Sequence, residues 1–344
     1  MKNMKAVIVE GPNKLSLSEV PLPSLKEKAQ EGRALIRVEA AAICATDLEV
    51  FTGRIPVKYP VIPGHEWSGV VEEVADPADA HWVGRRVVGS NDICCLKCDA
   101  CRSGLWRNCA SFREIGFKEN GAYAEYMTVP VYALYELPEK ISFIQGALIE
   151  PVGVAVGTLE KTGAAFGETL LIFGAGSIGL NILAVARAMG MRRIIVAAKS
   201  DKCLDTALKM GAYAFAATEN TDIIKFAREH HPEGTDVVID ATGNEGCICA
   251  AFKIAKRGGK VGLAGYGKGE TMNIRIDDVH IENLRVAGAG NNWNVVKQCL
   301  RLLEDGIIDT STLATDIIKL EDYAAGIKMA EERPRGFVKA LFVK

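Results

Sequence analysis

Four cysteines with short, regular spacing are the clearest chemical feature of this 344-residue sequence. Cys95, Cys98, Cys101 and Cys109 are separated by two, two and seven residues. Four thiolates on one loop match the tetrahedral coordination of zinc and leave no open position for a substrate. We therefore predict a structural zinc site. A local disulfide or a run of free thiols is the alternative, and a nucleic-acid-binding zinc knuckle is a third.

A second set of potential metal ligands is spread over the first 150 residues. It consists of Cys44, the adjacent pair His65 and Glu66, and Glu150. A thiolate, an imidazole and a carboxylate with one open position are typical of a catalytic zinc, because an alcohol oxygen can then bind the metal. Taken singly, each of these residues is equally consistent with a packing or surface role.

Polar residues that follow Cys44 fit roles around such a metal. Thr46 is placed to take a proton from a zinc-bound hydroxyl, and Asp47 to orient the ring of His65. Glu49 has three interpretations: a relay for the proton, a contact for a substrate amine or hydroxyl, or a carboxylate on the solvated face of a helix.

A glycine-rich turn predicts a dinucleotide site. An apolar strand at residues 170–173 leads into Gly-x-Gly-x-x-Gly and then into a helical pattern. Such a turn lets backbone N–H groups approach a pyrophosphate at the start of the helix. The residues that we expect to contact the cofactor are Gly174, Gly176, Ser177, Ile178, Gly179, Ala198, Lys199, Ser200 and Lys202.

The end of the second strand predicts which nucleotide is bound. Ala198 occupies the position from which an acidic residue would bind the ribose 2′-OH of NAD. Lys199 and Ser200 follow, and a lysine beside a hydroxyl suits a 2′-phosphate. We therefore favour NADP over NAD. Asp201 is the counter-argument, because a shift in strand length would bring its carboxylate to the ribose.

These sites need two kinds of structural unit. The first 150 residues carry short alternating runs, such as 34–39 and 67–74, which predict short strands in an irregular β-barrel-like domain. After Pro151 strands alternate with helices, which predicts a doubly wound parallel sheet. The expected elements of that second part and of the tail are strands at 170–173, 193–198, 236–240 and 260–265, helices at 295–304 and 320–331, and a strand at 338–343.

Composition excludes several classes of protein. Hydrophobic residues make up 49% and charged residues 24%, and the net charge of −2 provides no electrostatic footprint for nucleic acid. The longest uncharged run, residues 169–186, is interrupted by glycines, so we predict no membrane segment. Ten cysteines without a disulfide-scaffold spacing favour a reducing compartment, and we expect the protein in the cytoplasm.

Taken together, the motifs resemble those of the zinc-containing medium-chain dehydrogenases, and the resemblance covers essentially the full length. The features that match the family in order and spacing are Cys44, His65, Glu66, the four-cysteine loop, Glu150-Pro151 and the turn 174–179. Residues 63–66 and 147–151 are similar to the sorbitol, butanediol and threonine dehydrogenase group. Residues 64–69 and 121–130 are similar to aminocyclitol dehydrogenases of the 2-deoxy-scyllo-inosamine type.

The resemblance implies an α/β fold with two domains. A GroES-like, irregular β-barrel catalytic domain would comprise residues 1–153 and 286–344. A Rossmann domain with a doubly wound parallel sheet would comprise residues 154–285. It also implies a homodimer or homotetramer.

The same resemblance implies two zinc ions per chain. Cys44, His65 and Glu150 would hold the catalytic ion, with Glu66 as an alternate ligand and Thr46 as the proton relay. The four-cysteine loop would hold the structural ion. The sequence departs from many relatives at two positions: Ala45 stands where they have glycine, and Glu49 where they have a histidine on the proton path.

The sequence thus predicts a zinc-dependent oxidoreductase that transfers a hydride between a secondary alcohol and NAD(P). The expected substrate is a polyol, cyclitol or aminocyclitol, with Asn291, Asn292 and Trp293 as candidates to contact it or, alternatively, to form a turn with a packing tryptophan. One alternative is an NAD-linked threonine or simple alcohol dehydrogenase. Another, of a different class, is a non-catalytic sensor that binds zinc and NADP.

Overall fold

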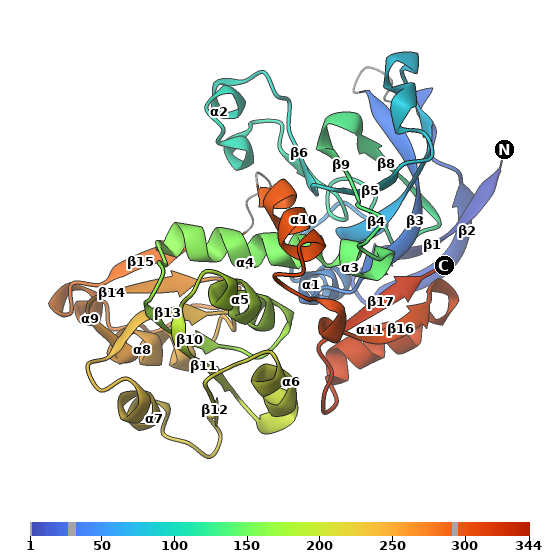
Figure 1. The fold of residues 1–344 in the computed structure, drawn as a ribbon. Helices are drawn as coiled ribbons and strands as arrows, with labels where there is room; N and C mark the ends of the chain where they lie inside the picture. Colours follow the sequence, from blue (N-terminus) through green and yellow to red (C-terminus); the bar gives the residue numbers. More distant parts are fainter. Residues whose placement is uncertain (1, 27–31, 291–294) are drawn as a thin grey trace.

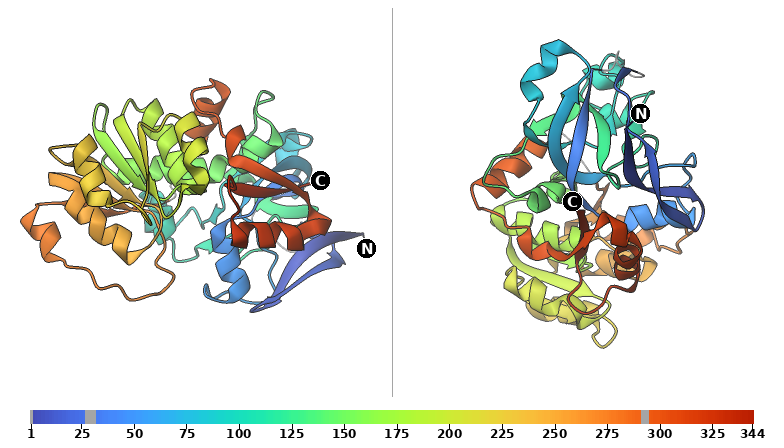
Figure 2. Two further views of the ribbon diagram at one scale, coloured as in Figure 1. Left: turned by 90° about the horizontal axis from the view of Figure 1, so that it is seen from below. Right: turned by 90° about the vertical axis from the view of Figure 1, so that its right-hand side faces the viewer.

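The computed structural model describes residues 2–26, 32–290 and 295–344. The chain divides between a β-rich part, which contains both termini, and an α/β part formed by the middle of the sequence (Figure 1). Both views in Figure 2 show the C-terminal segment, in red, returning to the N-terminal part of the chain, in blue. Residues far apart in the sequence therefore build the β-rich part together.

Two sheets make up most of the β-rich part. β1 (Asn3–Gly11) and β2 (Lys14–Pro21) form an antiparallel pair. The larger sheet has the order β16-β17-β3-β4-β5-β9, and β8 pairs with β3. Its strands are β3 (Arg33–Ala42), β4 (Glu66–Val74), β5 (Arg86–Gly89), β8 (Tyr126–Pro130), β9 (Leu134–Glu136), β16 (Ala314–Lys319) and β17 (Lys339–Val343). The strands expected at 34–39, 67–74 and 338–343 are confirmed; the second and third agree within one residue, and the first continues three residues further, to Ala42.

Short elements connect these strands. They are the helices α1 (Ala45–Thr52), α2 (Asp99–Arg102), α3 (Phe143–Ala147) and α11 (Tyr323–Glu332), and the two-residue strands β6 (Asp92–Ile93) and β7 (Arg113–Glu114). α11 occupies part of the helix expected at 320–331, which begins with a 3-10 turn at Leu320–Asp322.

The α/β part contains a six-stranded sheet in which every neighbouring pair is parallel. The strand order is β12-β11-β10-β13-β14-β15, which is the order of a doubly wound dinucleotide-binding fold. Its strands are β10 (Thr169–Phe173), β11 (Arg192–Ala198), β12 (Ala214–Ala217), β13 (Thr235–Asp240), β14 (Ala255–Leu263) and β15 (Arg285–Gly288). The predicted fold class is confirmed.

Helices cover both faces of this sheet, as the alternation of buried side chains requires. The face with Leu170 and Ile172 packs against α4 (Ile149–Thr162), α5 (Ser177–Ala188) and α10 (Val296–Glu304). The face with Leu171 and Phe173 packs against α7 (Ile223–His230) and α8 (Glu245–Ile254). α6 (Leu204–Lys209) and α9 (Asp277–Ile281) complete the helices of this part.

The two parts share one apolar core. The cluster that contains α4, α5 and α10 also includes Ala42, Leu137 and Leu341 from the β-rich part. The predicted domain limits at 153 and 286 fall inside α4 and β15. These limits stay a prediction. Among the described residues, no helix combines the length and the apolarity needed to span a bilayer.

One predicted strand begins at the wrong residue. A strand was expected at 260–265, after Gly258-Gly259, but β14 starts at Ala255 and includes both glycines. Gly258 has a φ of 74° and lies beside a register shift between β13 and β14. The glycines therefore form a bulge inside the strand and do not end a turn before it.

Candidate active site

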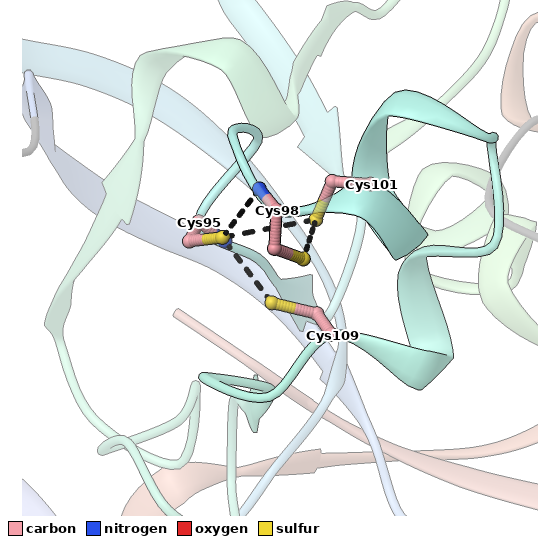
Figure 3. Close-up of side chains that lie close together, drawn as sticks. All are labelled: Cys95, Cys98, Cys101 and Cys109. Atoms are coloured by element: carbon pink, nitrogen blue, oxygen red, sulfur yellow. Dashed lines mark hydrogen bonds between the residues drawn. The ribbon is translucent and has the colours of Figure 1, made fainter.

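The four predicted structural ligands lie together on a lobe formed by the loop after β6, with α2 and a 3-10 turn at Trp106–Asn108. The Sγ atoms of Cys95, Cys98, Cys101 and Cys109 all lie within 4.8 Å of one another. Figure 3 shows the four side chains pointing toward one another. Four converging sulfur atoms are the donor set that a structural zinc requires.

Backbone N–H groups of the lobe are aimed at these sulfur atoms. The N–H groups of Cys98 and Cys95 donate to the sulfurs of Cys95 and Cys109, each at 3.4 Å. The backbone N–H groups of Lys97 and Cys98 lower the pKa of the Cys95 thiol to about 6, which favours the thiolate that binds metal. The neighbouring Cys94 is different: burial raises its pKa to about 12, and its thiol donates to the carbonyl of Trp106 at 3.4 Å.

The second ligand set forms where β3 and β4 pair. Ala42, the last residue of β3, is opposite Glu66, the first residue of β4. Cys44 and His65 therefore lie next to each other, one just after β3 and one just before β4. Ligand atoms of Cys44, His65 and Glu66 all lie within 4.8 Å of one another. Their chemistry fits an open zinc site.

Asp47 organises this set. Its carboxylate lies 3.1 Å from Nδ1 of His65 and accepts hydrogen bonds from the Tyr123 hydroxyl at 2.6 Å and the Cys44 N–H at 2.9 Å. Burial lowers the pKa of His65, but the Asp47 carboxylate raises it more, so the net pKa lies above its ordinary value. Gly64 has a φ of 96°, and a Cβ there would lie 2.4 Å from the Tyr123 ring.

Glu66 is held from one side only. Nζ of Lys339, on β17, lies 2.8 Å from Oε1, and both residues are buried. Oε2 is buried and has no hydrogen-bond partner among the described residues, so it is free to bind a metal ion. Glu150, in the first turn of α4, is outside the group of converging ligand atoms. Burial, reinforced by the charge of Glu66 and opposed by that of His65, raises the pKa of Glu150 to about 8.

Two further predicted residues lie on α1. Oγ1 of Thr46 is 3.4 Å from Sγ of Cys44, so its hydroxyl lies beside the ligand set. Glu49 is only 7% exposed, which excludes the interpretation of a solvated carboxylate. It pairs with Arg54 at 2.5 Å and with Lys268 at 2.8 Å. Lys268 lies beyond β14, so this pair joins the two parts of the molecule.

The glycine-rich turn joins β10 to α5, as predicted. A Cβ at Gly179 would lie 1.8 Å from the carbonyl oxygen of Gly174, so only glycine fits. Gly176 is the N-cap of α5, with no side chain capping the helix. The Ser177 hydroxyl, in the first helical position, is buried and has no partner among the described residues. Unoccupied donors in this turn fit a phosphate group.

The loop after β11 contains the residues predicted to select the nucleotide. Ala198 ends the strand, followed by Lys199 and Ser200. Asp201 forms two contacts with the Arg335 guanidinium, at 2.9 and 3.1 Å. Lys202, expected to contact the cofactor, donates through Nζ to the carbonyl of Arg333 at 3.0 Å.

Three predicted site residues cannot be placed, and three residues that contact the site were not predicted. Asn291, Asn292 and Trp293 lie outside the described residues. Sequence reasoning missed Tyr123, Lys339 and Arg335 as partners of predicted site residues. Lys339 carried a usable signal, because a lysine at the start of the apolar strand 339–343 is unusual unless it is paired.

The sequence of this chain is similar to those of known proteins. Residues 30–139 match the family described as "Alcohol dehydrogenase GroES-like domain", and residues 177–305 match "Zinc-binding dehydrogenase". "Probable D-xylulose reductase A" of Emericella nidulans is 32% identical, over 93% of this chain and 91% of that relative. "Sorbitol dehydrogenase" of Bacillus subtilis is 28% identical, again over 93% of this chain and 91% of the relative.

Solved structures agree. A proposed zinc-binding dehydrogenase from Sinorhizobium meliloti 1021, bound to NADP, has a TM-score of 0.90 and 29% identity, with 100% of both chains covered. An Escherichia coli CFT073 alcohol dehydrogenase (rspB), complexed with NADH, has a TM-score of 0.91 and 25% identity, with 99% of both covered. The chain belongs to the zinc-dependent medium-chain family of alcohol and polyol dehydrogenases, which are NAD(P)-linked oxidoreductases.

Proposed function

We propose that this enzyme oxidises a secondary hydroxyl of a polyol, cyclitol or aminocyclitol and passes the hydride to NADP. The observation that carries the proposal is the convergence of Cys44, His65 and Glu66 within 4.8 Å, beside the Thr46 hydroxyl. A thiolate, an imidazole and a carboxylate leave one position open for the alcohol oxygen. A protein that only binds zinc and nucleotide would not need that open position.

Cys44 and His65 would hold the catalytic zinc together with a carboxylate, from Glu150 or from Glu66. The unpartnered Oε2 of Glu66 supports Glu66 as a ligand in the arrangement seen here. Zinc bound there would act as a Lewis acid that stabilises the alkoxide form of the substrate hydroxyl. The four cysteines of the lobe would hold a second, structural zinc.

The chain's own residues would position the reaction. The Thr46 hydroxyl would take the substrate proton, and its short distance to the Cys44 sulfur supports that role. Asp47 would keep the His65 ring in one orientation. Glu49 would either continue the proton path or contact a polar substituent of the substrate.

The loop after β11 supports NADP as the preferred nucleotide. Ala198 supplies no carboxylate to bind a ribose 2′-OH or to repel a 2′-phosphate. The carboxylate of Asp201, which would favour NAD, is engaged by both nitrogens of the Arg335 fork. Lys199 and Ser200 would then bind the 2′-phosphate.

The remaining parts of the proposal rest on resemblance and composition. We place the catalytic domain at residues 1–153 and 286–344 and the Rossmann domain at 154–285, in a homodimer or homotetramer. None of the ten cysteines forms a disulfide, which supports the cytoplasm as its compartment. A second candidate is an NAD-linked threonine dehydrogenase, because "L-threonine 3-dehydrogenase" of Bacillus velezensis is 29% identical over 97% of this chain.

The experiment is an initial-rate comparison on zinc-loaded enzyme. Linear polyols, inositols, aminocyclitols, threonine and short alcohols would each be tested with NADP and with NAD. We expect turnover of a linear or cyclic polyol, with the higher kcat/KM for NADP. Turnover of threonine alone with NAD would select the second candidate. Bound nucleotide and zinc without turnover of any substrate would favour the non-catalytic sensor.

A further inference from the structure

The guanidinium of Arg333 lies against the glycine-rich turn. A Cβ placed on Gly176 would lie 2.7 Å from Nη2 of Arg333, so the arginine covers the N-cap of α5. Arg333 follows α11, which packs on β16 and β17 in the β-rich part. An arginine from one part of the molecule therefore contributes to the nucleotide-binding turn of the other.

An anion would favour this contact electrostatically. The N-terminus of a helix carries a partial positive charge, which disfavours a cation. Even so, the guanidinium of the exposed residue Arg333 sits at the start of the 12-residue helix α5, where no hydrogen bond or ion pair to it is seen among the described residues. The buried Ser177 hydroxyl beside it has no partner either. A phosphate between Arg333 and the helix would satisfy both groups.

The backbone around Arg333 is held in place. Arg333 has a φ of 46°, a left-handed conformation that is costly for a residue with a Cβ. Its carbonyl accepts the bond from Lys202, and the N–H of Gly336 donates to the carbonyl of Lys202 at 3.0 Å. Arg335 adds its two contacts with Asp201. Residues 333–336 thus form an arm fixed to the loop after β11.

This arm contacts two loops at the carboxyl edge of the parallel sheet. β10 and β11 are neighbours in the parallel sheet, so the loops at their carboxyl ends lie side by side. One is the glycine-rich turn and the other is the loop at residues 199–203. Arg333 contacts the first with its guanidinium and the second with its carbonyl.

We infer that Arg333 is a phosphate ligand of the dinucleotide, contributed by the β-rich part of the molecule. Its place at the N-terminus of α5 assigns it to the pyrophosphate; a ribose 2′-phosphate offers the same chemistry and is the other source. Binding of the nucleotide then links the two parts of the molecule through this arm. The inference rests on the proposed use of a nicotinamide dinucleotide.

The test is calorimetric titration of zinc-loaded enzyme with ADP-ribose and with 2′-phospho-ADP-ribose, which need no hydride transfer. The variants are Arg333→Gly, Arg333→Lys and the control Lys328→Gln, which removes an exposed charge from α11. Glycine accepts a positive φ, so Arg333→Gly should unfold at the same temperature as the wild type or higher. A charge-assisted bond to phosphate is worth about 10- to 100-fold in affinity.

We expect Arg333→Gly to bind both ligands about 10- to 100-fold more weakly, Arg333→Lys to recover part of the loss, and Lys328→Gln to match the wild type. A loss confined to 2′-phospho-ADP-ribose would assign Arg333 to the 2′-phosphate instead. Unchanged affinity of Arg333→Gly for both ligands would overturn the inference and leave the proposed function intact. A wild type that binds neither ligand would contradict the proposed function, and the inference with it.

Discussion

At the scale of single residues, the candidate active site depends on Asp47. Its carboxylate contacts the ring of His65 and the backbone N–H of Cys44, two of the candidate metal ligands. Its carboxylate is buried, and its pKa is lowered because the His65 and Tyr123 contacts outweigh the effect of burial. The aspartate thus stays ionised next to the imidazole. That charge holds the ring in an orientation in which His65 would present its other nitrogen to a metal ion.

Asp47→Asn keeps the shape of the side chain and removes its charge. We expect the affinity for the catalytic zinc to fall by about 10- to 100-fold, because the imidazole loses its orienting carboxylate. Competition with a chelator, followed by counting of zinc per chain, measures this. Tyr123→Phe is the control, since it removes one hydrogen bond to Asp47 and leaves the charge. Wild-type zinc affinity in Asp47→Asn would show that Asp47 has no such role.

At the scale of elements, the four-cysteine lobe makes a prediction about the zinc content of two cysteine variants. Cys98→Ser removes one of the four converging sulfurs, so we expect one zinc per chain to be lost and the melting temperature to fall. Cys94→Ser is the matched control, because Cys94 lies beside the lobe but outside the ligand set. Zinc analysis and thermal unfolding of both variants test this. Equal zinc contents in the two would contradict it.

The contact between β10 and β13 predicts how the stability of the fold depends on pH. Oδ2 of Asp236 accepts hydrogen bonds from the N–H and hydroxyl of Thr169, at 2.8 and 2.7 Å, and Lys256 binds Oδ1. Burial raises the pKa of Asp236, but these contacts outweigh it and lower the pKa to about 2. A lowered folded-state pKa stabilises the fold above the unfolded value of 3.8 and loses that effect as the pH falls through 2.

Asp236→Asn should therefore be less stable than the wild type near neutral pH, by about 1 kcal/mol once solvent screening is included. The difference should shrink as the pH falls from about 4 toward 2, because the unfolded chain takes up a proton at this carboxyl over that range while the folded protein does not until about pH 2. Denaturant unfolding of both proteins across this range measures it. A difference that stays constant with pH would mean that the charge of Asp236 contributes nothing.

Most elements of the α/β part were predictable because strand, glycine turn and helix follow one another locally, as at β10 and α5. β12 was missed because its sequence, Ala214–Ala217, has little strand propensity, and its pairing with β11 determines its structure. The pairing of Glu49 with Lys268 was not foreseeable for a similar reason. The two residues are brought together only when the two parts pack, so no local pattern reports it.

At the scale of the whole molecule, the C-terminal arm at residues 333–336 contacts the loop after β11 from the other part of the chain. The sequence identified Asp201 as the residue that would favour NAD, but its partner Arg335 is far away in the chain. The convergence of Cys44, His65 and Glu66, and of the four lobe cysteines, was predictable because their residue types and spacing are typical of metal sites. The partner of Asp201 was not predictable, because only the tertiary contact reveals it.

Arg335→Gln should release Asp201. We expect the ratio of kcat/KM for NADP to that for NAD to fall by roughly 3- to 10-fold, because a freed carboxylate binds a ribose 2′-OH and repels a 2′-phosphate. Initial rates with both nucleotides measure the ratio. Arg335→Gln combined with Asp201→Asn should restore it. A wild-type ratio in Arg335→Gln alone would show that the arm does not influence the choice between NADP and NAD.

The central claim is that the site at Cys44 holds a zinc used for hydride transfer, distinct from the zinc of the cysteine lobe. The most direct measurement combines zinc content with the rate of polyol-dependent nicotinamide reduction, in wild-type enzyme and in Cys44→Ser. We predict two zinc ions per chain and turnover in the wild type, and one zinc and no turnover in the variant. A Cys44→Ser enzyme that keeps both zinc ions and its turnover would contradict the claim.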